Sequence, residues 1–453
     1  MPAVIDDTIA ALATPAGESA LALVRVSGPR CAALVGEIFA APPLPRSAVH
    51  ADYRDRNGAL VDDVLYTFFA GPHSYTGEDA LELSSHGSPY IAQRLLEDLW
   101  ARGCRPAEAG EFTQRAFLHG RLDLSQAEAV MDLIHARSEA ALAAAHRQLR
   151  GALGRRIADL IAQLVGLLAH VEAYLDFPDE DLPAEDRAVL AAGVAALAAG
   201  TGRLLATERY GDLLRGGVRT VLVGATNAGK SSLLNRLLGW ERALVSPEPG
   251  TTRDFLEEPR PAGPYCLRLV DTAGLNPAPG PLERQGIART LERAAAADLI
   301  LLVLDTTCPS PVLPPDLASC LHSSHTVVVW NKADLAPPPT APLPAGAGWR
   351  TVAVSALDGR GLPELESAIV AAIDDHRLDA SAEGVAINAR HAHDLRAAQE
   401  CLAAAQVKLL GGAPDELLAA DLRGALDALG RIGGKVDHER VLDEIFSKFC
   451  IGK

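Results

Sequence analysis

The stretch GATNAGKS, residues 224–231, fits the phosphate-binding pattern G-x-x-x-x-G-K-[ST]. The run VRTVLV before it is typical of a strand, and KSSLLNRLLG after it is typical of a helix, which is the context that the pattern requires. In such a loop, backbone N–H groups surround phosphate oxygens, Lys230 reaches the β- and γ-phosphates, and Ser231 ligates Mg²⁺. The pattern alone occurs by chance in roughly a few per cent of chains of this length. The neighbouring segments must therefore show whether this one binds a nucleotide.

Two segments downstream supply the residues that a phosphate-bound metal needs. LRLVDTAG is an apolar strand that delivers Asp271 to the metal shell and Gly274 to the γ-phosphate. GTTRD, residues 250–254, offers Thr252 as a second Mg²⁺ ligand in a switch loop. The sequence therefore predicts a P-loop nucleotide hydrolase.

Two further segments select the base. TVVVWNKAD ends in Asn331, Lys332 and Asp334, and the Asp334 carboxylate can accept the N1–H and 2-amino hydrogens of guanine, a donor pair that adenine lacks. VAVSAL ends in Ser355 and Ala356, which can support the base. We predict a Mg²⁺-dependent GTP hydrolase. The residues expected to contact GTP are Asn227, Ala228, Gly229, Lys230, Ser231, Ser232, Ser246, Thr251, Thr252, Asp271, Thr272, Ala273, Gly274, Asn331, Lys332, Asp334, Ser355, Ala356 and Leu357.

The hydrolytic machinery departs from that of many GTPases. Leu275 stands where a water-orienting glutamine often follows the glycine, so another group must position the water. Arg253 is a weak candidate for an arginine finger. The oxygen of Asn227 suits an alkali cation, whose charge could replace that finger, although a loop-capping role for Asn227 stays open.

The rest of the chain indicates several domains. A length of 453 residues favours roughly three domains. Short β-rich runs and one amphipathic helix near residues 89–102 indicate a small α+β domain. From Ser125, which with Glu128 has the spacing of a capping box, apolar residues at helical spacing predict one long helix or a closely joined pair.

Strands alternating with helices follow from Gly216, and helices return near the C-terminus. We therefore expect an α/β and α+β multidomain chain, in which a P-loop α/β G domain is inserted into a helical domain whose two parts pack together. The expected segments are 1–118 (N-terminal α+β domain), 119–215 (helical), 216–376 (G domain) and 377–453 (helical, with the C-terminal tail).

Composition indicates a cytoplasmic protein. Asp6 and Asp7 stand where a signal peptide would carry Lys or Arg, and no apolar run approaches the roughly 20 residues of a membrane span. The seven scattered cysteines indicate reduced thiols. The formal net charge is −16, so we expect this chain to be a poor primary binder of nucleic acid, and a more basic partner or a local basic patch to do the holding.

The motifs together resemble a known family. DTIAALATPAGESALALVRVSG, YTGEDALELSSHG, GEFTQRAFLHGRLDLSQAEAVMDLI, TNAGKSSLLN, GTTRD, DTAGL, LERQGIAR, ELLAADLRGAL and the terminal FCIGK are similar to segments of the bacterial tRNA uridine-modification GTPases MnmE (TrmE), in order from about residue 6 to the last. The resemblance implies a tetrahydrofolate-binding and dimerising N-terminal domain, a homodimer, and a heterotetramer with the FAD-dependent protein MnmG. It also implies an aminomethyl or carboxymethylaminomethyl group installed on C5 of the wobble uridine, position 34, of certain tRNAs, with the tRNA held mainly through the partner.

The resemblance also implies ligands for K⁺, which in this family drives G-domain dimerisation and hydrolysis. By motif, Asn227, Ser246, Glu248 and Thr251 would line the cation. Glu283, in LERQGIAR, would orient the attacking water, whereas from the residues alone it is a solvated carboxylate near a helix start.

A folate site is the third implication. The ligand would be a 5,10-methylene- or 5-formyl-tetrahydrofolate, and the matching positions are Arg25, Glu82, Arg121 and Lys453. Glu82 could accept the donor edge of the pterin, and the cations could meet its acceptor and carboxylate groups. Cys450 would stand beside the one-carbon carrier as a catalytic thiol, or it anchors the tail as a small apolar residue.

Two other functions fit part of the sequence. A ribosome-assembly or signalling GTPase could have the same G domain, but would lack the folate-type N-terminal segment and the cysteine tail. A folate-dependent enzyme with a regulatory G domain and a substrate other than tRNA is the second alternative.

Overall fold

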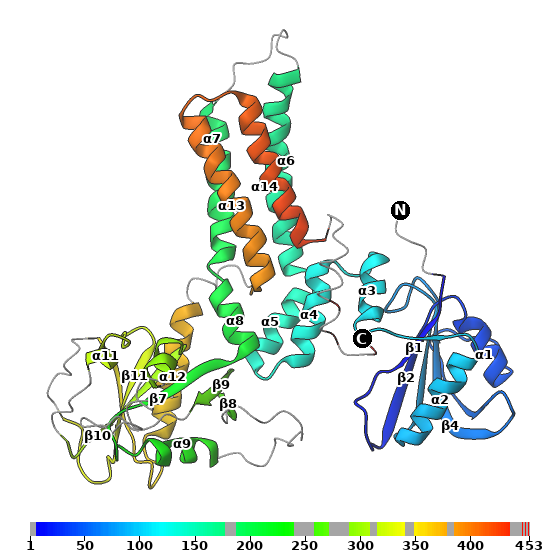
Figure 1. Ribbon diagram of the computed structural model, residues 1–453, viewed down its shortest axis with the longest axis horizontal. Coiled ribbons are helices and arrows are strands. Elements are labelled where there is room, and N and C mark those ends of the chain that lie inside the picture. Colours follow the sequence, from blue (N-terminus) through cyan, green and yellow to red (C-terminus); the bar gives the residue numbers. More distant parts are fainter. Residues whose placement is uncertain are drawn as a thin grey trace. The chain divides into compact units, whose positions relative to one another are not determined.

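The computed structural model describes residues 6–176, 187–239, 258–270, 290–308, 315–339, 348–377 and 385–434, together with Phe446, Phe449 and Gly452. The chain divides into two compact units (Figure 1). One comprises Met1–Met131, Leu149–Ala158 and Leu429–Lys453, and the other comprises Asp132–Gln148 and Asp159–Ala428. The first unit thus joins the N-terminal segment to the C-terminal tail.

A six-stranded sheet forms the N-terminal α+β domain, as the β-rich runs predicted. Its order is β3-β4-β5-β2-β1-β6, and all pairs are antiparallel except β1 with β6. The strands are β1 (Ile9–Leu12), β2 (Leu21–Ser27), β3 (Ala48–Arg54), β4 (Leu60–Phe69), β5 (Ala80–His86) and β6 (Arg105–Pro106).

Two helices cover one face of this sheet. Alternating residues of β2, β4 and β5, such as Val24, Tyr66 and Leu83, form one core with helices α1 (Cys31–Phe39) and α2 (Pro89–Ala101). The residues between them, including Arg25, Asp63 and Glu82, therefore belong to the opposite face of the sheet. That outer face carries the charged residues discussed below.

A buried guanidinium ties helix α3 (Glu111–Leu118) to the domain. The side chain of Arg115 is 0% exposed and pairs with Asp7 (2.6 Å), Glu78 (3.2 Å) and Glu111 (2.9 Å). Burial alone would raise the pKa of Asp7 and Glu111, but hydrogen bonds from Arg105 and Arg115 outweigh it and hold the pKa of both carboxyls below the ordinary value.

The helices after residue 121 differ from the prediction in number and in their cap. Instead of one long helix or a pair, there are three: α4 (Leu124–His135), α5 (Glu139–Leu149) and α6 (Ala152–Asp176). The capping box lies two residues earlier than predicted, because Asp123 Oδ1 accepts from the Gln126 N–H at 2.8 Å and Gln126 Oε1 accepts from the Asp123 N–H at 2.9 Å. Ser125 is instead buried and donates to Asp123.

Helices before and after the α/β segment pack together in the second unit, as expected for an inserted domain. Helix α7 (Arg187–Leu205) contacts α13 (Ala389–Leu410), which is followed by α14 (Asp415–Ile432). Ion pairs Arg187–Asp415 and Glu172–Arg423 join α7 and α6 to α14. A short helix, α8 (Glu208–Gly216), leads into the α/β domain.

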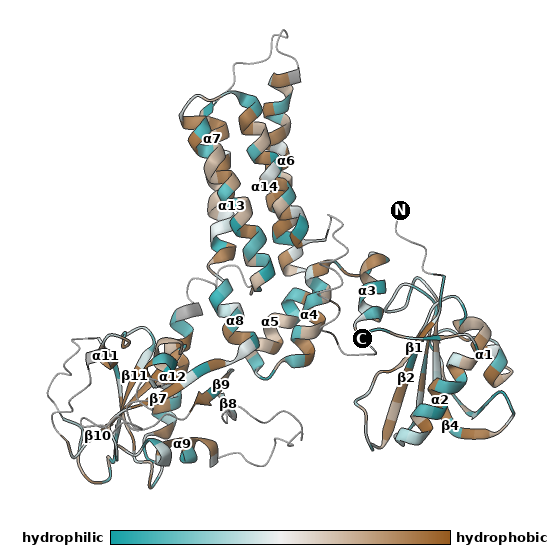
Figure 2. Cartoon of the chain, in the orientation of Figure 1, coloured by the Kyte–Doolittle hydropathy of each residue, from teal (hydrophilic) through white to brown (hydrophobic). Residues whose placement is uncertain are grey.

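The α/β domain is a six-stranded sheet of order β12-β11-β10-β7-β9-β8, parallel except for β8. Alternate residues of β10 and β11 belong to two different cores, one on each face, so both faces are covered as in other parallel sheets (Figure 2). The elements are β7 (Val218–Val223), α9 (Lys230–Gly239), β8 (Glu258–Ala262), β9 (Tyr265–Val270), β10 (Leu299–Asp305), α11 (Pro315–Ala318), β11 (Thr326–Asn331), β12 (Arg350–Ala353) and α12 (Leu362–Arg377).

Two helical stretches among the described residues are long and apolar enough to cross a membrane by length and composition alone, a test that core helices also pass, so the absence of a membrane span stays a prediction. They are Ala152–Leu175 and Arg187–Gly216. Charged residues interrupt both stretches, so neither contains a long unbroken apolar run. Their mean hydropathy is nevertheless high because they are rich in alanine and leucine. Both stretches contact other helices: α7 packs against α13, and Glu172 of α6 pairs with Arg423 of α14. Helix α8, at the end of the second stretch, carries several charged residues.

Replacing Arg115 with Met should destabilise the protein by about 3–5 kcal/mol, because three carboxylates would lose the cation that they share. The exposed pair Arg54–Asp52 provides the control, since Arg54→Met should cost less than about 1 kcal/mol. Urea unfolding of both variants gives the comparison. Equal losses in the two variants would show that the Arg115 network contributes no more than a surface ion pair.

Candidate nucleotide site and C-terminal tail site

The phosphate-type loop lies between β7 and α9, as the sequence predicted. Two of its glycines have positive φ and no room for a side chain: a Cβ on Gly224 would lie 2.2 Å from the Val303 carbonyl, and one on Gly229 would lie 2.2 Å from Asn331 Nδ2. Asn227 adopts the left-handed conformation, with φ of 65°. The backbone is therefore curled in the way that presents N–H groups to an anion.

Lys230 and Ser231 occupy the start of α9. The Lys230 ammonium is nearly buried and donates to the carbonyls of Gly224 (3.0 Å) and Ala225 (2.7 Å), so it lies across the loop. Ser231 and Ser232 are exposed. A hydroxyl at a helix N-terminus beside a phosphate loop suits a Mg²⁺ ligand, since this ion prefers oxygen and shares its shell with phosphate.

Asn331 connects the loop to the base-binding segments. Its amide N–H donates to the Ala228 carbonyl at 2.9 Å, and its side-chain oxygen accepts from the Ala356 N–H at 3.1 Å. The side chain is buried at the end of β11. One amide thus fixes two predicted segments, 224–231 and 354–357, relative to each other.

Lys332 is held by a neighbour that sequence reasoning missed. Its ammonium donates to Asp305 Oδ2 at 2.6 Å, and its carbonyl accepts from the Thr306 hydroxyl at 2.8 Å. Burial would raise the pKa of Asp305, but hydrogen bonds from Lys332 and Thr307 lower it. Asp305 ends the apolar strand β10, next to β11, and that juxtaposition is the signal that could have revealed it.

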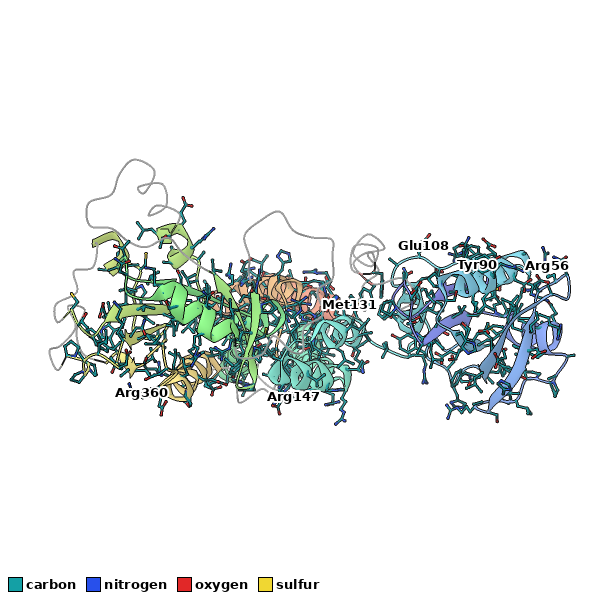
Figure 3. The ribbon with its side chains drawn as sticks, turned by 90° about the horizontal axis from the view of Figure 1, so that it is seen from below. Arg56, Tyr90, Glu108, Met131, Arg147 and Arg360 are labelled. Atoms are coloured by element: carbon teal, nitrogen blue, oxygen red, sulfur yellow. The ribbon has the colours of Figure 1, made fainter. Side chains whose placement is uncertain are left out.

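The base-binding end is less enclosed. Ser355 is buried, its N–H donates to the carbonyl of Arg360, and its hydroxyl accepts from the Asp358 N–H at 3.3 Å. The Arg360 side chain, labelled in Figure 3, is itself exposed. Asp334 is half-buried. The Leu357 side chain is 81% exposed, so any contact that Leu357 makes with a nucleotide is expected through its backbone.

Several predicted site residues lie outside the described residues. They are Ser246, Glu248, Thr251, Thr252, Asp271, Thr272, Ala273, Gly274, Glu283, Cys450 and Lys453.

A second candidate site lies on the outer face of the N-terminal sheet. Arg25 on β2 and Glu82 on β5 are cross-strand partners, and two hydrogen bonds of 2.8 and 3.0 Å join the guanidinium to Glu82 Oε1. The rings of Tyr75 and Phe112 lie 5.7 and 5.8 Å from the guanidinium carbon. The pair is thus enclosed by aromatic surface, which suits a planar ligand with a polar edge.

The C-terminal tail reaches this pair. Gly452 accepts a hydrogen bond from Arg25 at 3.2 Å, and a Cβ on Gly452 would lie 2.5 Å from the Leu12 carbonyl. Phe446 and Phe449 are buried in a cluster with residues of α4, and they lie against Gly110. The aromatic side chains therefore anchor the tail on the N-terminal domain.

The folate role of Arg121 stays a prediction, and two aromatic residues that the sequence analysis did not single out lie beside Arg25. Arg121 is exposed beside Gly77, and none of the contacts found among the described residues joins it to Arg25 or Glu82. Sequence reasoning missed Tyr75 and Phe112, although both lie in quoted motifs, YTGED and GEFTQRAFL. Aromatic residues beside motif glycines were the available signal.

The loop, the Lys332 segment and the parallel sheet define a P-loop GTPase domain, carried by a chain with its own N-terminal and helical domains. The family model for the GTP-binding protein TrmE N-terminus matches residues 8–121, and the model for the MnmE helical domain matches residues 124–450. The chain belongs to the family of tRNA modification GTPases MnmE, and it is a GTPase acting in tRNA modification.

Relatives match the whole chain. The tRNA modification GTPase MnmE of Opitutus terrae is 57% identical over 449 residues, covering 99% of both chains. That of Akkermansia muciniphila is 43% identical over 454 residues, covering 98% of this chain and 99% of the relative. Among solved structures, the G domain of the T. maritima FeoB iron transporter matches 34% of this chain and 98% of its own, with 28% identity and a TM-score of 0.25.

Gly229→Ala should weaken GDP binding by roughly 10- to 100-fold, because the new methyl group would displace the Asn331 amide and strain a residue with φ of 88°. Gly239→Ala is the matched control at the other end of α9, where a Cβ meets open space. Calorimetric titration with GDP compares the two. Unchanged affinity in Gly229→Ala would remove Asn331 from the nucleotide site.

Proposed function

We propose that this GTPase uses a tetrahydrofolate one-carbon unit to form the (carboxymethyl)aminomethyl group at C5 of uridine 34, in a complex with the FAD-dependent protein MnmG. The supporting observation is the hydrogen bond from Arg25 to Gly452, which joins the C-terminal tail to the Arg25–Glu82 pair. A GTPase acting only as a switch has no need for a tail anchored on such a pair.

The residues around Arg25 fit a reduced folate. The Glu82 carboxylate accepts hydrogen bonds from an amidine-type edge, and Tyr75 and Phe112 offer flat apolar surface to a ring. The side chains of Arg25 and Glu82 are only 16% and 29% exposed, so their charges act in a partly dry environment. A bound 5,10-methylene- or 5-formyl-tetrahydrofolate would supply the one-carbon unit.

Cys450 is proposed as the thiol that assists the modification. It follows the buried Phe449 and precedes Gly452 by two residues, so the chain is anchored on both sides of it. A thiolate is the nucleophilic form, and Lys453 and Arg25 would favour it by charge. The alternative is that Cys450 only anchors the tail.

K⁺ is proposed to complete the GTPase site across a pair of G domains in the homodimer. Asn227 stands in the left-handed conformation in the middle of the phosphate loop, where its side chain leaves the curled backbone. With Ser246, Glu248 and Thr251 it would surround the cation, whose charge stabilises the phosphate oxygens during hydrolysis. Glu283 would orient the attacking water.

Binding of tRNA is assigned mainly to the partner. Affinity for phosphate requires cationic side chains, and this chain has 42 Lys and Arg against 58 Asp and Glu. We propose a cytoplasmic heterotetramer in which MnmG holds the tRNA.

Cys450→Ser should leave GTP turnover unchanged and abolish the modified uridine, because a hydroxyl is a far weaker nucleophile than a thiolate. The measurement is nucleoside mass spectrometry of tRNA from cells lacking the gene, complemented with wild type, Cys450→Ser or the exposed-thiol control Cys308→Ser. A normal level of modified uridine in Cys450→Ser would exclude a catalytic thiol and leave anchoring of the tail as the role of Cys450. Modified uridines that persist without the gene would favour the switch-GTPase alternative.

Asn227→Ala should reduce GTP hydrolysis in KCl by an amount of the order of 100-fold, and should make the rates in KCl and NaCl equal. The reason is that the variant loses an oxygen ligand of the proposed cation. Asn235→Ala, an exposed position on α9, is the control. Phosphate release is measured at equal ionic strength, and a wild-type rate that is the same in both salts would contradict the K⁺ site.

A further inference from the structure

A cluster of imidazoles and carboxylates lies on the edge of the N-terminal sheet, and neither candidate site uses it. Asp62 and Asp63 are on β4, His86 ends β5, and His50 is on the edge strand β3. Helices α1 and α2 cover the other face of the sheet, so the outer side chains of these strands reach solvent: His86 is 64% exposed and Asp63 is 52% exposed.

The strand register brings the side chains together. Asp52 pairs with Asp63 across β3 and β4, and the β4–β5 ladder, which pairs Leu65 with Ser84, continues to His86 opposite Asp63. Asp63 lies on the outer face with His86, whereas Asp62 is in phase with the buried residues Val64 and Tyr66, and its carboxylate nonetheless bonds to the His86 ring. Arg54 pairs with Asp52 at 2.8 Å. The carboxylates of Asp62 and Asp63 instead pair with the imidazoles of His86 and His50.

The donor atoms lie at the distances of ligands around one ion. His86 Nδ1 is 2.9 Å from Asp62 Oδ1 and 3.7 Å from Asp63 Oδ1, and the three ligand atoms all lie within 4.8 Å of one another. Adjacent ligands of a tetrahedral ion with bonds of about 2.1 Å are about 3.4 Å apart. His50 Nε2 lies 3.1 Å from Asp63 Oδ2, but it is not one of the three ligand atoms that lie within 4.8 Å of one another.

The backbone holds one of these ligands in place. The Asp62 carboxylate is 8% exposed, and its Oδ2 accepts the His86 N–H at 2.8 Å while its Oδ1 faces the His86 ring. A carboxylate fixed by a hydrogen bond to one oxygen keeps the other aimed, which is the role of outer-shell partners in metal sites. Little rearrangement is then needed for an ion to enter.

We propose that Asp62, Asp63 and His86 bind a divalent transition metal ion such as Zn²⁺. Imidazole nitrogen together with carboxylate oxygen suits Zn²⁺, Co²⁺ or Ni²⁺, whereas Ca²⁺ and Mg²⁺ prefer oxygen alone. Binding through Nδ1 of His86 displaces the ring proton that bonds to Asp62, and the proton leaves to solvent. The ion ties β4 to β5, beside the outer sheet face that carries Arg25 and Glu82.

Calorimetric titration of the full chain with ZnCl₂ tests the site. Wild type should bind one equivalent that His86→Ala and Asp63→Asn each lose or bind at least about 10-fold more weakly. His73→Ala, an exposed histidine of the same domain outside the cluster, should bind as wild type does. Isotherms of His86→Ala and Asp63→Asn that match wild type, or a wild type that takes up no Zn²⁺, would overturn the proposal.

A thermal measurement separates loss of the site from loss of the fold. Zn²⁺ should raise the Tm of wild type and His73→Ala, since a ligand that binds only the folded state stabilises it, and should leave the Tm of His86→Ala and Asp63→Asn unchanged. The shift of each protein is measured from its own Tm without Zn²⁺, because His86→Ala also removes a partner of the buried Asp62 carboxylate. Equal Zn²⁺-induced shifts in all four would place the ion elsewhere. GDP affinity does not enter either readout, so the outcome is independent of the GTPase and folate assignments.

Discussion

The buried guanidinium of Arg115 is the constraint on which the N-terminal domain depends. It gathers Asp7, Glu78 and Glu111 from three separate segments, and the two largely buried carboxylates, Glu78 and Glu111, would be costly to bury without it. Glu111 begins the helix that carries Phe112, and Glu78 closes the loop that carries Tyr75, which also bonds to Thr113. The ion network around Arg115 therefore positions the aromatic surface beside Arg25. The motif GEFTQRAFL contributes to this surface through Phe112, and to its positioning through Glu111 and Arg115.

The nucleotide site is built on the same principle with a neutral group. The Asn331 amide uses a donor to hold the phosphate loop and an acceptor to hold the segment after β12. Lysine or aspartate at this position could satisfy only one of the two partners, because each offers only donors or only acceptors when charged. Position 331 therefore needs a side chain that both donates and accepts a hydrogen bond. This requirement alone favours asparagine before Lys332, independently of any contact with a base.

The centre of the α/β domain could be predicted from sequence because β7, β10 and β11 are largely apolar, and β7 and β11 each lead into a nucleotide-binding motif. Strand β11 and helix α9 were predicted at their observed residues, since apolar runs bounded by a glycine loop or by polar motif residues leave little choice. The region after residue 121 was predicted less well. Its alanine-rich sequence keeps the periodicity of a helix across the positions after His135 and Leu149, where the helices end. The residue that caps α4 is Asp123 and not the predicted Ser125. Contacts made across the chain, such as Arg25 with Gly452, leave no local pattern, so only the fold reveals them.

The division of the chain sets a condition on how GTP could drive the modification. The phosphate loop belongs to one compact unit, while the Arg25–Glu82 pair and Gly452 belong to the other. Helices α6 and α14 contribute residues to both, so the chain itself joins the units through continuous helical backbone. Since a ligand shifts an equilibrium only by its differential affinity for two states, GTP can act on the tail only if the two nucleotide states favour different arrangements of these helices. Helix α14 ends at Ile432, and the tail that follows it carries Phe446, Phe449 and Gly452, so a change in α14 is the shortest route along the chain from the helical domain to Arg25.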